Sequence, residues 1–179
     1  MQLLTDWIIT VGRIGISPIP KTFQEEAVKA KGKTASAIVV IALAQTTGYL
    51  VAYPLLGADI HLFVLVGGLF LYPITFLFFV FCLHVLYKKL FNRKKEHYEE
   101  LLYLITALYL PFIIINTAGE IWANQIVIWA SWGIFLFLIG VILKTITKLN
   151  VWQTALVVFL GAILAFAGLY CIPFFSSVL

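Results

Sequence analysis

The chain alternates long apolar stretches with short polar ones, and this alternation is the dominant pattern in its sequence. A helix needs roughly 20 apolar residues to cross the hydrocarbon core of a membrane, and most of the apolar stretches reach that length. No Asp, Glu, Lys or Arg lies in the middle of any of them. We therefore predict an all-α integral membrane bundle of five transmembrane helices, at about residues 35–55, 61–87, 101–117, 121–143 and 151–174.

The third of these stretches is short for a membrane span. It either recruits part of residues 94–100, or a kink at Pro111 lets it cross a thinned part of the membrane. In both cases we expect it to be a span, because the alternation of the loops requires one here.

Residues 1–15 predict a short amphipathic helix ahead of the spans. Its apolar positions recur at helical spacing, at Leu4, Trp7, Ile8, Val11 and Ile14. The polar residues Asp6, Thr10 and Arg13 lie off this stripe, and the segment is too short to cross a membrane. We expect an interfacial helix in the headgroup region, and a helix packed on protein is the alternative.

A second short helix is expected before the first span. Thr22 to Glu25 has the form of a capping box, in which the Thr22 hydroxyl and the Glu25 carboxylate bind each other's backbone N–H. The helix should be basic, with Lys29 and Lys31, and should loosen at Gly32. Residues 1–34 thus form a cytoplasmic or interfacial segment, and residues 35–179 form the five-helix transmembrane domain.

The positive charges fall on one side of this arrangement. The sequence has 12 Lys and Arg, and with five spans all 12 lie before span one, between spans two and three, or between spans four and five. The opposite loops contain only the acidic residues Asp59 and Glu120. The positive-inside rule therefore predicts a cytoplasmic N-terminus and a C-terminus outside. Four or six spans would break this alternation.

The composition excludes a water-soluble domain. The chain is 63% hydrophobic and 11% charged, whereas soluble domains carry about 25% charged residues. The net charge of +4 is concentrated in a few loops, which suits an anionic membrane surface and not nucleic acid. We predict a multi-pass protein of the cell membrane, of the bacterial inner-membrane type.

The spans contain no group of residues that predicts catalysis. His84 is the sole ionisable candidate within a span, and no nucleophile–base pair stands at helical spacing. Cys82 and His84 are two residues apart and point in different directions on a helix, so they do not predict a metal site. We expect no enzyme activity, no metal and no cofactor.

Two features predict contacts with partners. The loop after span two contains five basic residues, which would bind anionic lipid or an acidic partner, or would act only as a topology determinant: Lys88, Lys89, Arg93, Lys94 and Lys95. Gly161, Ala165 and Gly168 form a strip of small residues on span five where another helix can approach closely. The sequence leaves open whether that helix belongs to this chain or to another subunit.

A few polar residues lie inside the spans or near their ends. Six of them suit hydrogen bonds between helices: Gln45, Thr46, Thr47, Asn124, Gln125 and Ser131. A polar path for a substrate, through Gln45, Thr46, Asn116 and Asn124, is the alternative interpretation.

The overall plan resembles the Yip family of multi-pass membrane proteins, in particular its compact bacterial branch. The resemblance covers about residues 18–175 and includes five spans with a cytoplasmic N-terminus. Its motifs are the entry Pro20-Lys21-Thr22-Phe23, a basic loop leading to Tyr98 and Tyr103, Pro111 in span three, and Trp152-Gln153-Thr154-Ala155 before span five. The aspartate-leucine-tyrosine-glycine-proline type motif of eukaryotic members is not recognisable, and neither is their long cytosolic N-terminal region. The resemblance implies a non-enzymatic protein that acts through membrane-protein partners, some of them ABC-type exporters.

Two functions are therefore expected as alternatives. The first is an accessory or scaffold protein that binds another integral membrane protein, as a subunit of a larger complex or exporter. The second is a small transporter or lipid-handling protein. The second predicts a water-filled cavity among spans one, three and four, and a dry, tightly packed bundle would exclude it.

Overall fold

The computed structural model describes residues 2–57, 66–93 and 95–170, and every regular element within them is a helix. The all-α prediction is confirmed for this part of the chain. The elements are α1 (Gln2–Ile16), α2 (Pro20–Ala27), the 3-10 turn η1 (Val28–Ala30), α3 (Thr34–Leu55), the π-helical turn η2 (Gly67–Leu71), α5 (Tyr72–Leu90), α6 (Tyr98–Ile121), α7 (Gln125–Thr147) and α8 (Val151–Tyr170).

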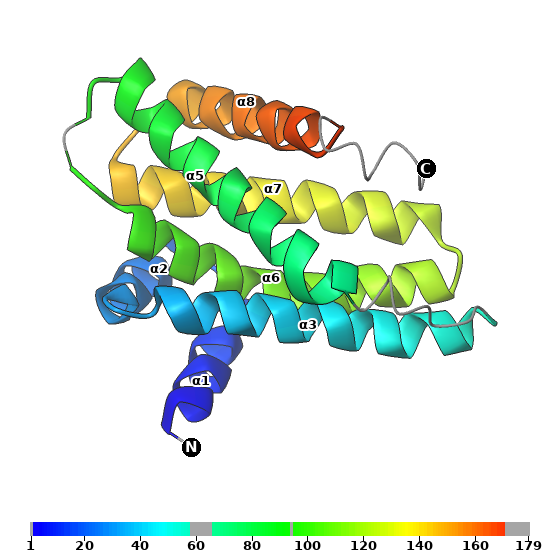
Figure 1. Cartoon of the computed structure of the whole chain (residues 1–179). Helices are drawn as coiled ribbons and strands as arrows, with labels where there is room; N and C mark the ends of the chain where they lie inside the picture. Colours follow the sequence, from blue (N-terminus) through cyan, green and yellow to red (C-terminus); the bar gives the residue numbers. More distant parts are fainter. Residues whose placement is uncertain (1, 58–65, 94, 171–179) are drawn as a thin grey trace.

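The long helices run back and forth between two ends of a bundle (Figure 1). At one end α3, α6 and α8 begin and α5 and α7 finish. We call this the basic end, because the described lysines and arginines lie there, in α1 and α2 or next to these helix termini. At the other end α6 turns into α7, and we call this the turn end.

Four described helices are long and apolar enough to cross a membrane: α3, Leu69–Leu90, α6 and α7. Helix α8 is also apolar, and it is described for 20 residues. The predicted second span begins within residues 58–65, and the predicted fifth span ends within residues 171–179; both of these stretches lie outside the described residues.

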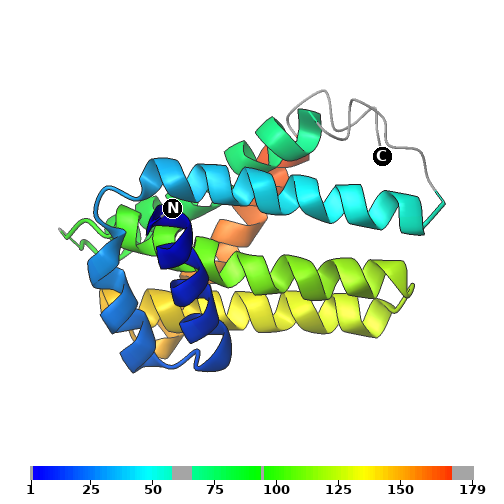
Figure 2. The ribbon, with the colours of Figure 1, turned by 90° about the horizontal axis from the view of Figure 1, so that it is seen from below.

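Helix α6 is the central element of the bundle. It packs between α3 and α7, and it also contacts α1, α2 and α5 (Figures 1 and 2). Nine consecutive residues, 101–109, are buried, which is the pattern of a helix surrounded by protein. It is 24 residues long and includes Pro111. Because it begins at Tyr98, the predicted extension into residues 94–100 is confirmed for its last part.

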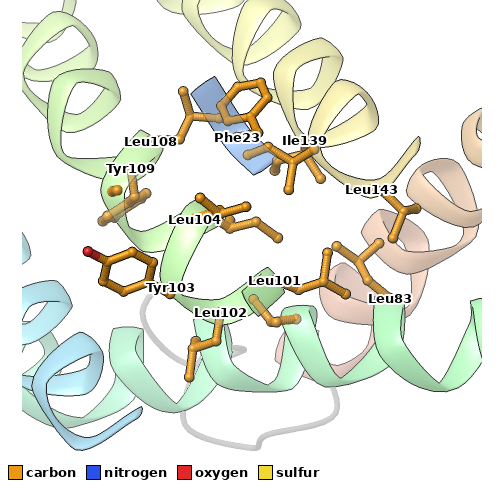
Figure 3. Close-up of a cluster of buried hydrophobic side chains, with 14 of the residues drawn as sticks. Phe23, Leu83, Leu101, Leu102, Tyr103, Leu104, Leu108, Tyr109, Ile139 and Leu143 are labelled. Carbon is orange, nitrogen blue, oxygen red and sulfur yellow. The ribbon is translucent and has the colours of Figure 1, made fainter. Parts of the chain in front are cut away.

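The core around α6 is built from large apolar side chains of four helices (Figure 3). Phe23 of α2, Leu83 of α5 and Ile139 of α7 are all fully buried against it. This packing lies toward the basic end, where α6 begins. It ties the N-terminal helices to the long helices, so the two predicted segments 1–34 and 35–179 share one core in the described structure.

Helix α1 is confirmed, but its buried face differs from the predicted stripe. Trp7, Thr10 and Ile14 are buried, while Ile8 of the predicted stripe is 64% exposed. The face of Thr10 is buried because its hydroxyl makes polar contacts there. This hydroxyl lies 2.8 Å from the Tyr103 hydroxyl and donates to Glu26 at 2.8 Å. Helix α1 is therefore packed on protein along one face and leaves isoleucines uncovered on another.

The predicted capping box at Thr22 is wrong. Helix α2 begins at Pro20, and its N-cap residue Ile19 makes no side-chain capping bond. Proline is pre-organised for the first helical position, so the helix starts three residues earlier than the box would place it. Thr22 is buried inside the helix, and Glu25 pairs with Arg13 at 2.6 Å instead.

Candidate ligand-binding cavity

A cavity of about 360 Å³ lies among α3, α5, α6, α7 and α8. Each helix lines it with one face at helical spacing, as in Gln45, Gly48, Tyr49 and Ala52 of α3. All the lining residues come from the half of each helix that is nearer the turn end. The volume falls within the range of about 300–1,000 Å³ that small-molecule sites occupy.

Aromatic rings form the wall of this cavity on the side of α6 and α7. Phe112 stacks on Phe135 with ring centroids 4.4 Å apart, and Trp132 meets Phe112 edge-on at 4.8 Å. Phe76 of α5 lies 5.1 Å from the ring of Tyr109. These rings hold one another in place, so the wall is a continuous aromatic surface.

Two tyrosines extend the wall to α3 and the start of α5. Tyr49 of α3 and Tyr72 of α5 meet edge-on, with ring centroids 5.5 Å apart. Tyr109 donates its hydroxyl to the side-chain oxygen of the buried Gln45. The cavity thus has polar atoms at a few fixed positions within a mainly apolar lining, as small-molecule sites typically do.

One lining residue has a formal charge. Glu120 stands at the end of α6, is exposed, and accepts a hydrogen bond of 2.6 Å from the side-chain amide of Asn116. The oxygen of that amide lies 3.3 Å from the Ser131 hydroxyl on α7, which also donates to the Ile128 carbonyl. This hydrogen-bonded series fixes the carboxylate relative to the aromatic wall. None of the described lining residues is Lys, Arg or His.

The structure separates the polar residues that the sequence grouped together. Gln45 and Asn116 line the cavity, as a polar path would require. The Thr46 hydroxyl is buried and has no hydrogen-bond partner among the described residues. Asn124 caps α7, where its side-chain oxygen accepts from the backbone of Ile126 and Val127 at 3.1 and 3.2 Å. That cap explains why α7 begins later than the predicted span.

The predicted partner contacts on α8 have neighbours within the chain. A Cβ atom at Gly161 would lie 2.6 Å from Leu83 Cδ2, so α5 of the same chain already makes the close approach there. Ala165 lines the cavity. Gly168 belongs to α8, but its surroundings lie outside what the structure describes. Contact between these residues and another subunit stays a prediction.

The basic loop between α5 and α6 is anchored by one tyrosine hydroxyl. Tyr87 donates to the Lys95 carbonyl at 3.0 Å and accepts from the His97 backbone N–H at 3.1 Å. Its hydroxyl also lies 3.3 Å from His84 Nδ1, so the one histidine expected within a span makes a contact with this anchoring tyrosine.

One basic side chain of that loop forms an ion pair within the described residues. Lys88 pairs with Glu96 at 2.8 Å, and this hydrogen bond lowers the pKa of the Glu96 carboxyl. The ammonium of Lys89 and the guanidinium of Arg93 have no ion pair within the described residues, and Lys94 lies outside them. Binding of anionic lipid by these residues stays a prediction.

A buried carboxylate joins α1, α2 and α6 at the basic end. The Glu26 side chain is fully buried and accepts hydrogen bonds from Thr10, Arg13 and Lys29 at 2.7 to 2.9 Å. Burial alone would raise its pKa, but the bonds from Lys29 and Thr10 and the nearby positive charges lower it. Sequence reasoning missed this cluster, because it depends on how α1 packs against α2, which the spacing of residues does not show.

Sequence reasoning also missed the aromatic wall and the place of Glu120. A signal was present, because Tyr72, Phe76 and Phe79 share one helix face, as do Tyr109, Phe112 and Asn116. Aromatic stripes of this kind usually pack in a core, so these rings were not expected to line a cavity. No family model, curated protein or solved structure matches the chain.

Proposed function

We propose that this protein is a non-enzymatic integral membrane protein that holds a small, mainly apolar molecule inside its helix bundle, as a small transporter or lipid-handling protein. The observation that carries the proposal is the cavity of about 360 Å³ among α3, α5, α6, α7 and α8. This function calls for a cavity among the first, third and fourth predicted spans, and α3, α6 and α7 contribute to the lining of this one. It also contains Gln45 and Asn116, two of the expected polar residues.

The proposal includes the membrane topology. In it α8 is the fifth span, the basic end faces the cytoplasm and the turn end faces outward, because positive charge favours the cytoplasmic side. The cavity then lies in the outer half of the membrane, and Glu120 stands near its outer surface. The protein would belong to the cell membrane, of the bacterial inner-membrane type.

The interfacial position of α1 is part of this arrangement. Its exposed isoleucines Ile8, Ile9 and Ile16 would face the headgroup and acyl-chain boundary of the inner leaflet. Its other face stays on α6 through Trp7 and Thr10.

The accessory-subunit function and the Yip resemblance stay predictions. They would place another integral membrane protein, such as an ABC-type exporter, against the small residues of α8 or against the basic loop. The aromatic cavity is what makes a ligand-holding function the better supported of the two.

Native mass spectrometry tests the proposal. The protein is purified in a nonionic detergent and released from micelles, and the masses of retained small molecules are recorded. The variant Ala162→Trp fills the cavity from α8. Leu164→Trp is the control, because it places the same indole side chain at an exposed position two residues away.

We expect retained molecules on the wild-type protein and on Leu164→Trp, and their loss from Ala162→Trp. Elution volume and thermal unfolding verify that both variants are folded. A folded Ala162→Trp variant that keeps the same adducts as the wild type would contradict the proposal. A stoichiometric protein partner in place of small molecules would support the accessory function instead.

A further inference from the structure

We propose that the ligand of this cavity carries a positive charge on an apolar body, so that the site selects lipophilic organic cations. This inference rests on the proposed function and names the ligand class of the same cavity. The features that carry it are the aromatic wall and the Glu120 carboxylate held at its end.

The aromatic wall favours a cation over a neutral or anionic molecule. The faces of Phe, Tyr and Trp rings are electron-rich, and they attract cations that come within about 6 Å of a ring centre. Trp132, Phe112 and Tyr109 present such rings from two helices, and Tyr49 and Tyr72 present them from the other side. Cages of this kind recognise quaternary ammonium groups, whose diffuse charge needs no hydrogen-bond acceptor.

The charge of the lining also favours a cation. Glu120 is the one formally charged residue among the described lining residues. Asn116 donates to its Oε1 atom, so the second carboxylate oxygen is left for a ligand, as far as the described residues show. An anionic ligand would meet this carboxylate without a described cation to offset it, and would be repelled.

The described cations are remote from the cavity. Those of the long helices, Lys88, Lys89 and Lys144, belong to the basic end, whereas the lining residues belong to the half nearer the turn end. The field inside the cavity is therefore set by the carboxylate and the rings.

The hydrogen bonds around Asn116 give it a positioning role. The amide donates to Glu120, and its oxygen lies beside the Ser131 hydroxyl of α7. This arrangement holds the carboxylate at the end of α6 next to the rings. A cation could then contact the carboxylate and a ring face together.

A matched pair of ions tests the inference. Tetraphenylphosphonium and tetraphenylborate have the same shape and opposite charge. Their dissociation constants are measured by isothermal titration calorimetry in a nonionic detergent. Dihexanoylphosphatidylcholine, added as a third probe, distinguishes a lipid headgroup from a free cation as the source of the positive group.

The variant Glu120→Gln removes the charge but keeps the shape and the bond to Asn116. Glu99→Gln is its control, because Glu99 is an exposed carboxyl near the start of the same helix. We expect tetraphenylphosphonium to bind at least about tenfold more tightly than tetraphenylborate, and Glu120→Gln to remove that preference. Glu99→Gln should leave it unchanged.

The possible outcomes separate the two proposals. Glu120-dependent binding of dihexanoylphosphatidylcholine alone would support the cation class and assign its source to a lipid headgroup. Equal binding of the two ions, or a preference that survives Glu120→Gln, would overturn the inference.

The ligand-holding function is judged separately. If the two ions bound equally and Ala162→Trp abolished their binding, that function would stand. If no probe bound the wild type, the inference would fail, and adducts retained by Ala162→Trp would remove the proposed function as well.

Discussion

Tyr109 of α6 donates its hydroxyl to the side-chain oxygen of Gln45 on α3, and both side chains are buried. The two residues are 64 positions apart in the chain. Their bond joins α3 to the central helix at the place where the cavity begins. A buried amide oxygen that loses its donor is costly, because the desolvated atom is left without the bond that compensated its burial.

We predict that Tyr109→Phe destabilises the protein by about 1–3 kcal/mol, since it leaves the Gln45 oxygen without that donor. Tyr53→Phe is the matched control, because Tyr53 lies on α3 and its hydroxyl makes no hydrogen bond to a described residue. Thermal unfolding in detergent measures both. Equal stability of Tyr109→Phe and the wild type would show that the bond contributes nothing.

The contact between Gly161 and Leu83 gives a second prediction. Gly161→Ala places a Cβ atom 2.6 Å from Leu83 Cδ2, so the buried leucine must move. We expect a loss of about 1–3 kcal/mol from this overpacking. Gly133→Ala on α7 should be neutral or slightly stabilising, because nothing lies within 4 Å of its added Cβ.

A double-mutant cycle isolates the cause of that loss. Leu83→Val shortens the side chain that the new methyl group meets, so Gly161→Ala should cost less in that background. If the cost were the same in both backgrounds, the close approach of α5 and α8 would not be its source.

The buried Glu26 predicts a pH dependence of stability. Its folded-state pKa is lowered from the ordinary value of 4.5. The stabilisation is therefore present above that ordinary value and is lost as the pH falls below 4.5 toward the folded-state pKa. Glu26→Gln should lose about 1–3 kcal/mol at neutral pH and lose less stability than the wild type on acidification.

Glu25→Gln is the control for this prediction. Glu25 also pairs with Arg13, but its side chain is 43% exposed. Loss of the Glu25–Arg13 ion pair should lower the free energy of unfolding by less than about 1 kcal/mol, since solvent screens exposed ion pairs. Unfolding curves recorded between neutral and acidic pH compare the three proteins. If the free energy of unfolding fell equally with pH in the wild type and in Glu26→Gln, the Glu26 carboxyl would be excluded as the cause of the acid sensitivity.

The topology predicts the side from which single cysteines react. In a background without Cys82 and Cys171, Asn92→Cys in the basic loop should react with a membrane-impermeant maleimide only after the cells are opened. Gln125→Cys, an exposed position at the turn end, should react in intact cells. The reverse pattern would require the bundle to be inverted in the membrane.

Much of the helical framework was predictable from the sequence. Helix α3 lies within a residue of the predicted first span, because the mainly apolar run after Lys33 contains no charged residue and, in a membrane, a helix satisfies its backbone hydrogen bonds. The starts of α2 and α7 were missed, because they depend on single residues: Pro20 at the first helical position of α2 and Asn124 as the N-cap of α7. The concentration of basic residues at one end was likewise visible in the loops.

Which face of each helix packs against protein was decided only by the tertiary structure. In a membrane both the lipid-facing and the protein-facing sides of a helix are apolar, so periodicity does not tell them apart. Nothing in the sequence indicated that α6 would be the surrounded helix. Nor did it indicate that Thr10 would be buried by Glu26 and Tyr103.

The cavity is the clearest case of this limit. In the sequence, Phe112 and Phe135 are indistinguishable from core residues, and Glu120 is indistinguishable from an ordinary polar residue at a helix end. Only the packing of five helices brings the rings and the carboxylate to one space of about 360 Å³. The sequence determined which segments are helical and which end is basic, because those properties depend on neighbouring residues. The site depended on contacts between distant helices, which side-chain shape and hydrogen bonding decide.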